Sequence, residues 1–138
     1  MTYSGEIHLK TKGYSDIIDI TDQVNKIVKN SNIKTGIVNI FCPGSTGGLT
    51  TIEYEPGLIK DIKVFLDKYL PYNYDYAHHQ TWHDDNGASH LRSAFIKTSF
   101  TAPVRNNKVV LGTWQQIIFI DFDTRPRTRK LIVTVLGD

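Results

Sequence analysis

Hydrophobic and polar positions along the chain follow two different periods, which predict a mixture of strands and helices. In residues 36–42, successive side chains of a strand would point to opposite faces, and both faces are apolar except at Asn39. The segment therefore predicts a strand that is buried on both faces except at Asn39. Apolar side chains between Leu58 and Tyr69 recur at helical spacing and form one continuous stripe, after a proline, Pro56, that suits a first helical turn. The pattern therefore predicts a helix here, ended by Pro71.

The rest of the chain divides in the same way. A helix is expected from Thr21, a good N-cap residue, and a short helix from Ser89 to Ile96, where a strand is the alternative. Asn106 and Asn107 form a type I′ turn signal, which predicts a hairpin. Further strands are expected at residues 3–9, 15–20, 49–53, 98–104, 108–114, 116–122 and 130–136.

Strands that gather at both ends of a chain, around a few helices, are typical of an α+β fold. We therefore expect a single domain over residues 1–138, with a mostly antiparallel β-sheet and two or three helices. Residues 71–88 show no clear period, and an irregular loop of this length in a small domain is often functional.

Composition narrows the class of protein. Charged residues make up 22% of the 138 residues and the net charge is +2, which is too small to indicate a nucleic-acid partner. The single cysteine, Cys42, excludes an intrachain disulfide and a cysteine-only zinc site. No apolar run approaches the ~20 residues of a membrane span, and the polar start is unlike a signal peptide. We expect a soluble cytoplasmic protein with no membrane partner.

Four of the five histidines lie close together in the sequence, within residues 78–90. Imidazole is the commonest protein ligand for zinc, and a nearby carboxylate such as Asp84 completes or orients such a site. His78, His83 and His90 are the candidate ligands, and the adjacent His79 is expected to point away. The alternative is a polar loop that happens to carry imidazoles, because the spacing matches no zinc finger.

A glycine-rich segment, residues 44–48, follows the expected strand at residues 36–42. Glycines let the backbone approach an anion, and the hydroxyl groups of Ser45 and Thr46 suit phosphate oxygens. The alternative is a plain turn, since the segment is neither a Walker loop nor a dinucleotide fingerprint. Glu53, soon after it, is a candidate general base or metal partner, or else a solvated strand end.

Two further segments carry candidate polar groups. Gln115, beside Trp114 at the edge of an apolar strand, needs a hydrogen-bond partner in a ligand or in the backbone. Arg125, Arg127 and Arg129 alternate, which would place them on one side of an extended chain as a phosphate clamp. The alternative is a charged turn that keeps a strand edge soluble.

Three blocks of sequence resemble the YjbQ-like family, namely residues 44–58, 82–92 and 111–116, followed by Asp121-Phe122-Asp123 and Arg125-Pro126-Arg127. The resemblance implies an α+β fold, a homotrimer with sites near the subunit boundaries, and an accessory thiamine-phosphate synthase activity. His78, His90, Glu53, Trp114 and Gln115 match characteristic residues of the family, and Arg92 lies at a position often occupied by lysine. Many members carry histidine where this chain has Gly44. If that histidine is a metal ligand in those members, the ligand is absent here, and His83 is the candidate substitute.

The hypothesis that follows is an enzyme acting on a phosphorylated small molecule, with accessory thiamine-phosphate synthesis as the specific reaction. Its alternatives are a metal-dependent hydrolase, in which Glu53 is the base, and a non-catalytic trimeric protein that binds a metal or small ligand. The cofactor is a divalent metal such as zinc, or Mg²⁺ if the substrate is a diphosphate. The assigned residues are Glu53, His90 and Gln115 as catalytic, Ser45, Thr46, Arg92, Trp114 and Arg125 as substrate-binding, and His78, His83 and His90 as metal ligands.

Overall fold

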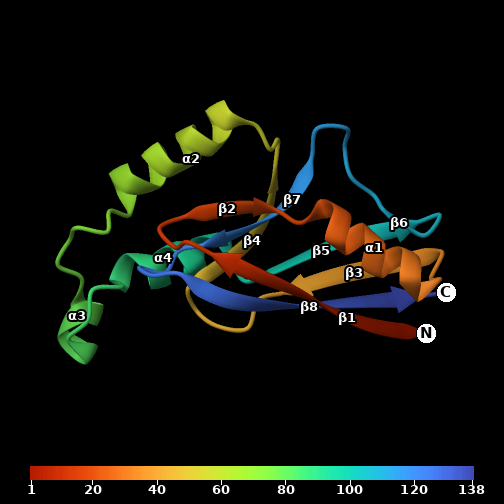
Figure 1. The fold of residues 1–138 in the computed structure, drawn as a ribbon, viewed down its shortest axis with the longest axis horizontal. Coiled ribbons are helices and arrows are strands. Elements are labelled where there is room, and N and C mark those ends of the chain that lie inside the picture. Colours follow the sequence, from red (N-terminus) through yellow and green to blue (C-terminus); the bar gives the residue numbers. More distant parts are fainter.

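The computed structural model describes all 138 residues and contains eight strands and four helices (Figure 1). The strands are β1 (Thr2–Thr11), β2 (Asp16–Asp19), β3 (Thr35–Phe41), β4 (Gly47–Ile52), β5 (Ser99–Arg105), β6 (Lys108–Val109), β7 (Gln116–Asp121) and β8 (Arg127–Gly137). The helices are α1 (Thr21–Ser31), α2 (Pro56–Tyr69), α3 (Ala77–Trp82) and α4 (Gly87–Ile96). None of these helices is long and apolar enough to cross a membrane.

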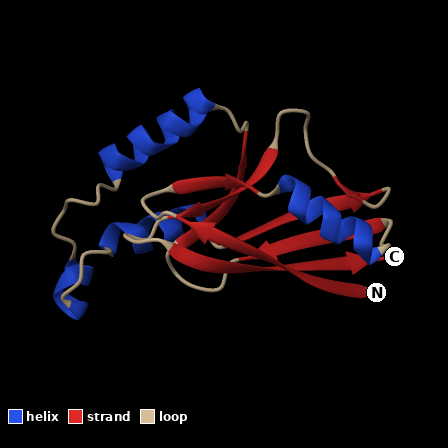
Figure 2. Cartoon of the chain, in the orientation of Figure 1, coloured by secondary structure: helices blue, strands red, loops and turns tan.

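The strands form two sheets, and every pairing is antiparallel. The larger sheet has the order β1-β8-β3-β5-β6, and the smaller sheet has the order β2-β7-β4. β1 and β8 pair from Thr2 opposite Leu136 to Thr11 opposite Arg127, so the first and last strands lie side by side (Figure 2). The α+β fold with mostly antiparallel pairing is therefore confirmed, although the strands divide between two sheets.

Two hydrophobic cores hold the layers together, and β7 belongs to both. Ile117 and Phe119 pack in the main core with α1 and the five-stranded sheet, whereas Ile118 and Ile120 face α2 and α4. All four side chains are at most 1% exposed, and burial of each contributes about 1.5–3 kcal/mol. Because both faces of β7 are covered, none of its faces meets water, and its sequence is a continuous apolar run instead of an alternation of apolar and polar residues.

The prediction that residues 36–42 are buried on both faces is wrong. Ile37 and Phe41 are 44% and 42% exposed, whereas Val38 and Ile40 on the other side of β3 are fully buried. The reason is that α1 and the smaller sheet cover only one face of the five-stranded sheet. Its opposite face is open in the single chain.

The predicted helices are confirmed at residues 21–30, 56–69 and 89–96, but two of their caps are wrong. Thr21 is already helical, and its hydroxyl group binds Asp19 and the backbone N–H of Ile117. α4 begins at Gly87, two residues before Ser89, with Asn86 as N-cap. α3 was not expected within the loop at residues 71–88, because six residues are too few to show a period.

The hairpin between β5 and β6 has the predicted type I′ turn, with φ of 51° at Asn106 and 58° at Asn107. Its second strand was predicted to reach residue 114 but ends at Val109. The next position of β5 toward β6 is Pro103, which accepts a bond from Val110 but has no N–H to return. The ladder therefore stops there.

Candidate functional site

His78 and His90 face each other between the two short helices α3 and α4. Their ring centroids are 4.5 Å apart, with an angle of 36° between the ring planes. His78 Nδ1 lies 3.1 Å from Asp84 Oδ1, close enough for an ion pair when the imidazole is protonated. The pair does not have hydrogen-bond geometry, so Nδ1 is a buried polar atom without a hydrogen-bond partner. A buried polar atom without a partner calls for an explanation, and a bound ligand is one.

The environment of His90 favours the neutral imidazole. Burial is the largest cause that lowers its pKa from 6.5, and the nearby His78 lowers it further. Asp84, Asp123 and a backbone hydrogen bond at Ser45 act in the opposite direction but do not restore the ordinary value. At neutral pH, His90 therefore has a nitrogen that can accept a proton or bind a metal.

Two hollows meet at His90. The larger, of about 480 Å³, is lined by Gly44, Ser45, His90, Ser93, Ala94, Lys97 and Thr98. The smaller, of about 360 Å³, is lined by Tyr76, Ala77, His78, Gly87, His90 and Leu91. The first is mostly polar and basic in its side chains, and the second has apolar walls between the two imidazoles and α4.

The other two clustered histidines do not face this pair in the same way. His79 Nε2 accepts a hydrogen bond of 2.9 Å from the backbone N–H of Gly87, so His79 caps α4. This contact agrees with the expectation that His79 points away from His78. His83 ends α3 in the left-handed conformation, with φ of 54°, and is exposed. No three His, Cys, Asp or Glu side chains form a metal-binding group within the chain. The set His78, His83 and His90 is thus not assembled here, and a metal remains a prediction.

A buried ion pair between Arg129 and Asp121 contacts the glycine-rich segment through Thr46. Arg129 Nε and Nη2 donate to the two carboxylate oxygens of Asp121 at 2.7 and 2.8 Å, and Nη2 also donates to Thr46 Oγ1 at 2.7 Å. Burial alone would raise the pKa of Asp121, but the bonds from Arg129 and Thr11 outweigh it and the pKa lies below 3.8. Thr46 is buried, whereas Ser45 is exposed at the larger hollow.

The three alternating arginines are not one clamp. Arg127 pairs with Asp123 at 3.2 Å, Arg129 is buried on Asp121, and Arg125 is exposed in the turn before β8. The sequence analysis grouped all three arginines as a candidate clamp but assigned only Arg125 as a substrate-binding residue. The alternation nevertheless indicates where Arg129 lies. In a strand that starts at Arg127, the side chains of Arg127 and Arg129 lie on the same, inner face.

Arg92 was predicted to bind substrate, and its placement contradicts that role. Its side chain is fully buried and donates to the Leu70 carbonyl, to Ser15 Oγ at 2.8 Å and to Asp67 Oδ1 at 3.0 Å. The guanidinium also stacks over the Tyr72 ring at 4.1 Å. Because its donors face the chain itself, Arg92 joins α4 to the end of α2 and does not reach the hollows.

Glu53, Trp114 and Gln115 lie at the opposite end of β4 from the histidines. Gln115 Nε2 donates to Thr51 Oγ1 at 2.9 Å, and Trp114 is 72% exposed beside it. Glu53 follows the end of β4 and is exposed. β4 itself spans five strand steps of ~3.3 Å, roughly 17 Å, from Gly47, which accepts a hydrogen bond from Ser93 of α4, to the end near Glu53. In Figure 1 the start of α2 lies well away from helices α3 and α4.

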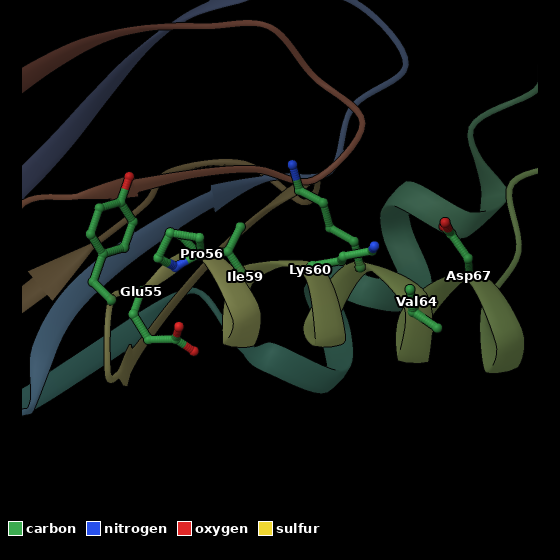
Figure 3. A pocket seen from close by; sticks show the side chains of 8 residues that line it. Glu55, Pro56, Ile59, Lys60, Val64 and Asp67 are labelled. Carbon is green, nitrogen blue, oxygen red and sulfur yellow. The ribbon is translucent and has the colours of Figure 1, made fainter.

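The largest hollow, of about 590 Å³, runs along α2 and contains no histidine (Figure 3). Glu55 and Pro56 line it at the start of the helix and Asp67 near the end, with Ile59, Lys60 and Val64 between. The paired histidines are the better candidate for chemistry, because two hollows share His90 in their lining and the pKa of His90 is lowered.

These features define a class of small α+β proteins in which two antiparallel sheets carry a short helical hairpin with paired histidines over a glycine-rich loop. Comparison with known protein families gives a match over almost the whole chain. The chain belongs to the family described as UPF0047 protein YjbQ-like, whose model matches residues 5–138.

Relatives of known sequence and structure extend over almost the whole chain. A UPF0047 protein of Archaeoglobus fulgidus is 41% identical over 131 residues, which cover 95% of this chain and 99% of the relative. YugU of Bacillus subtilis is 33% identical over 132 residues, covering 95% and 97%. A solved structure from Sulfolobus solfataricus, of unknown function, has a TM-score of 0.94 and 35% identity, covering 100% and 99%.

Proposed function

We propose that this protein is an enzyme acting on a phosphorylated small molecule in the groove around His90. The observation that carries the proposal is the pairing of His78 and His90 at the junction of two hollows. One of these imidazoles has a lowered pKa, and the other has a buried nitrogen without a hydrogen-bond partner. His79, by contrast, accepts a hydrogen bond at the start of α4 and has no part in the proposal.

Each residue of the groove has a role that its position supports. Ser45 is exposed at the larger hollow and donates its hydroxyl group to a phosphate oxygen. His90, neutral at pH 7, takes or returns a proton at the bond that breaks. The alternative role of His90 is as a metal ligand: a divalent metal such as zinc would be held by His78 and His90 with Asp84 nearby, and it would then stabilise negative charge on the leaving group in place of proton transfer by His90.

The specific reaction that we propose is accessory thiamine-phosphate synthesis, which the family resemblance implies. A pyrimidine methyl diphosphate joins a thiazole phosphate through a new carbon–nitrogen bond, and pyrophosphate leaves with the electrons of the broken carbon–oxygen bond. This chemistry needs stabilisation of a departing anion more than it needs a strong nucleophile. The polar hollow beside Ser45 and Lys97 suits that requirement.

A homotrimer would complete the site. Glu53, Trp114 and Gln115 lie too far from the histidines to share a small substrate within one chain, and Trp114 is largely exposed. In a trimer with sites at the subunit boundaries, these three residues of one protomer orient a substrate held by the histidines of its partner. The open apolar positions of the five-stranded sheet, such as Ile37 and Leu136, support assembly.

The test is to incubate the protein with the two thiamine precursors and measure pyrophosphate. We expect turnover that is lost in His90→Ala and Glu53→Ala and kept in His8→Ala, a control histidine exposed on β1. Equal turnover in all three variants indicates a contaminating synthase and contradicts the proposal. Absence of turnover in the unmodified protein contradicts the specific reaction.

Metal-dependent hydrolysis of a phosphate ester is the second candidate. It is favoured by the neutral state of His90, since only a neutral imidazole binds a metal. Release of phosphate from a simple aryl phosphate, dependent on added zinc and on Glu53, would support this reaction over synthesis.

A further inference from the structure

Arg129 has donor groups that the fold does not use. Its side chain is only 6% exposed, and Nε and Nη2 make all three of its hydrogen bonds, to Asp121 and Thr46. Nη1 makes none. The bidentate pair with Asp121 fixes the plane of the guanidinium, so the two N–H groups of Nη1 point in a direction set by the fold.

Gly44 leaves the approach to Nη1 open. A Cβ built on this glycine would meet only one atom within 4 Å, Arg129 Nη1 at 3.6 Å. The residue has φ of 122°, a conformation that side chains rarely adopt, so the backbone keeps this position clear. Gly44 also lines the larger hollow, so Nη1 lies next to a residue of the hollow's wall that has no side chain to cover it.

The other charged groups around this hollow also favour an anion. Lys97 lines it, is exposed, and makes no ion pair within the chain. Of the carboxylates that act on His90 or lie beside Arg129, Asp121 is paired with Arg129 and Asp123 with Arg127, and Asp84 lies 3.1 Å from His78 Nδ1. The free donors are thus the Lys97 ammonium group and the Ser45 hydroxyl group, which line the hollow, and the Nη1 group of Arg129, which lies beside Gly44 in its wall.

We propose that Arg129 Nη1, Lys97 and Ser45 form the phosphate subsite of this protein, which deepens the proposed function and depends on it for the reaction itself. A tetrahedral phosphate offers three terminal oxygens, one for each of these donors, whereas a carboxylate offers two. Arg125, the contact predicted from sequence, lies in the exposed turn instead.

The same geometry indicates the class of substrate. The second hollow shares His90 with the first, and Tyr76, Ala77 and Leu91 form its other walls. A molecule with its phosphate beside Lys97 therefore extends an apolar or aromatic part along α4, and the bond between the two parts lies at His90. The substrate is a phosphorylated aromatic or apolar small molecule, not a phosphorylated sugar or peptide.

Calorimetric titration with inorganic phosphate and with phenyl phosphate, at constant ionic strength, tests the subsite. We expect Lys97→Gln to weaken phosphate binding by about tenfold or more, the effect of losing one charge-assisted hydrogen bond. Lys130→Gln is the matched control, because Lys130 is 55% exposed on β8 and pairs with Glu6. It should leave the affinity unchanged.

Two further measurements separate the parts of the inference. Phenyl phosphate should bind more tightly than phosphate, and Leu91→Asn should remove that advantage without changing the affinity for phosphate. Gly44→Ala, checked for folding by circular dichroism, should weaken both ligands because its methyl group covers Nη1. Equal phosphate affinity in Lys97→Gln and Lys130→Gln, or no binding at all, overturns the subsite. Binding as expected, without turnover of any precursor, upholds the subsite and refutes the proposed reaction.

Discussion

Replacement of Arg92 by methionine should destabilise the fold strongly, although Arg92 was first predicted to contact substrate. The guanidinium is fully buried and holds together three segments that are distant in sequence. It donates to Ser15, 77 residues away, and to Leu70 at the end of α2, and it stacks on Tyr72. Methionine fills a similar volume but donates nothing.

The magnitude follows from the groups left behind. The Leu70 carbonyl and the Ser15 hydroxyl group lose a donor in a buried place, at ~1–3 kcal/mol each, and the stacking on Tyr72 contributes up to ~2 kcal/mol. The ion pair adds little, about 0–1 kcal/mol, because the Asp67 side chain is 66% exposed. Relief from burying a cation offsets part of the loss. We therefore expect the free energy of unfolding to fall by about 3 kcal/mol.

Urea denaturation followed by circular dichroism, at one fixed protein concentration, measures this loss. Asp67→Asn should cost no more than about 1 kcal/mol. Arg105→Met, at an exposed arginine that makes no ion pair, should stay within about 0.5 kcal/mol. An Arg92→Met variant as stable as these controls, but with a raised KM, would refute the structural role and restore substrate binding.

Two other predictions concern the paired histidines. Elemental mass spectrometry of protein purified without chelators should find about one zinc or other transition metal per chain, lost in His78→Ala and His90→Ala; no metal after zinc is supplied would contradict the ligand assignment. Because the folded pKa of His90 lies below 6.5, the unfolded chain binds its proton more readily, so stability falls as pH drops below about 6.5. In chelator-treated protein, urea midpoints at about pH 7.5 and about pH 5.5 should therefore differ less in His90→Gln; an equal difference in both proteins would refute this assignment.

Much of the fold was predictable because it depends on neighbours in the sequence. The stripe after Pro56 defines α2, the pair Asn106-Asn107 defines the type I′ turn, and the apolar run at residues 117–120 defines a strand. In each case the side chains themselves restrict the backbone or require cover from water, whatever the rest of the chain does.

The candidate site was predictable only in part. The concentration of histidines in the sequence singled out residues 78–90 as a candidate site, which stays a prediction, and it did not distinguish the roles of His78, His83 and His90. In the structure His78 and His90 face each other, His79 caps α4 and His83 ends α3. These roles depend on the angle between α3 and α4, which no short pattern encodes.

The sequence by itself determined the α+β class, most of the elements and the family to which the chain belongs, because local preferences and ordered motifs carry that information. Tertiary structure alone decided that Arg92 is buried and that Arg129 donates a hydrogen bond to Thr46, 83 residues away. It also decided that Glu53 and Gln115 lie far from the histidines. Such contacts join residues that are remote in sequence, and only the packing of the two sheets and their helices determines which donor meets which acceptor.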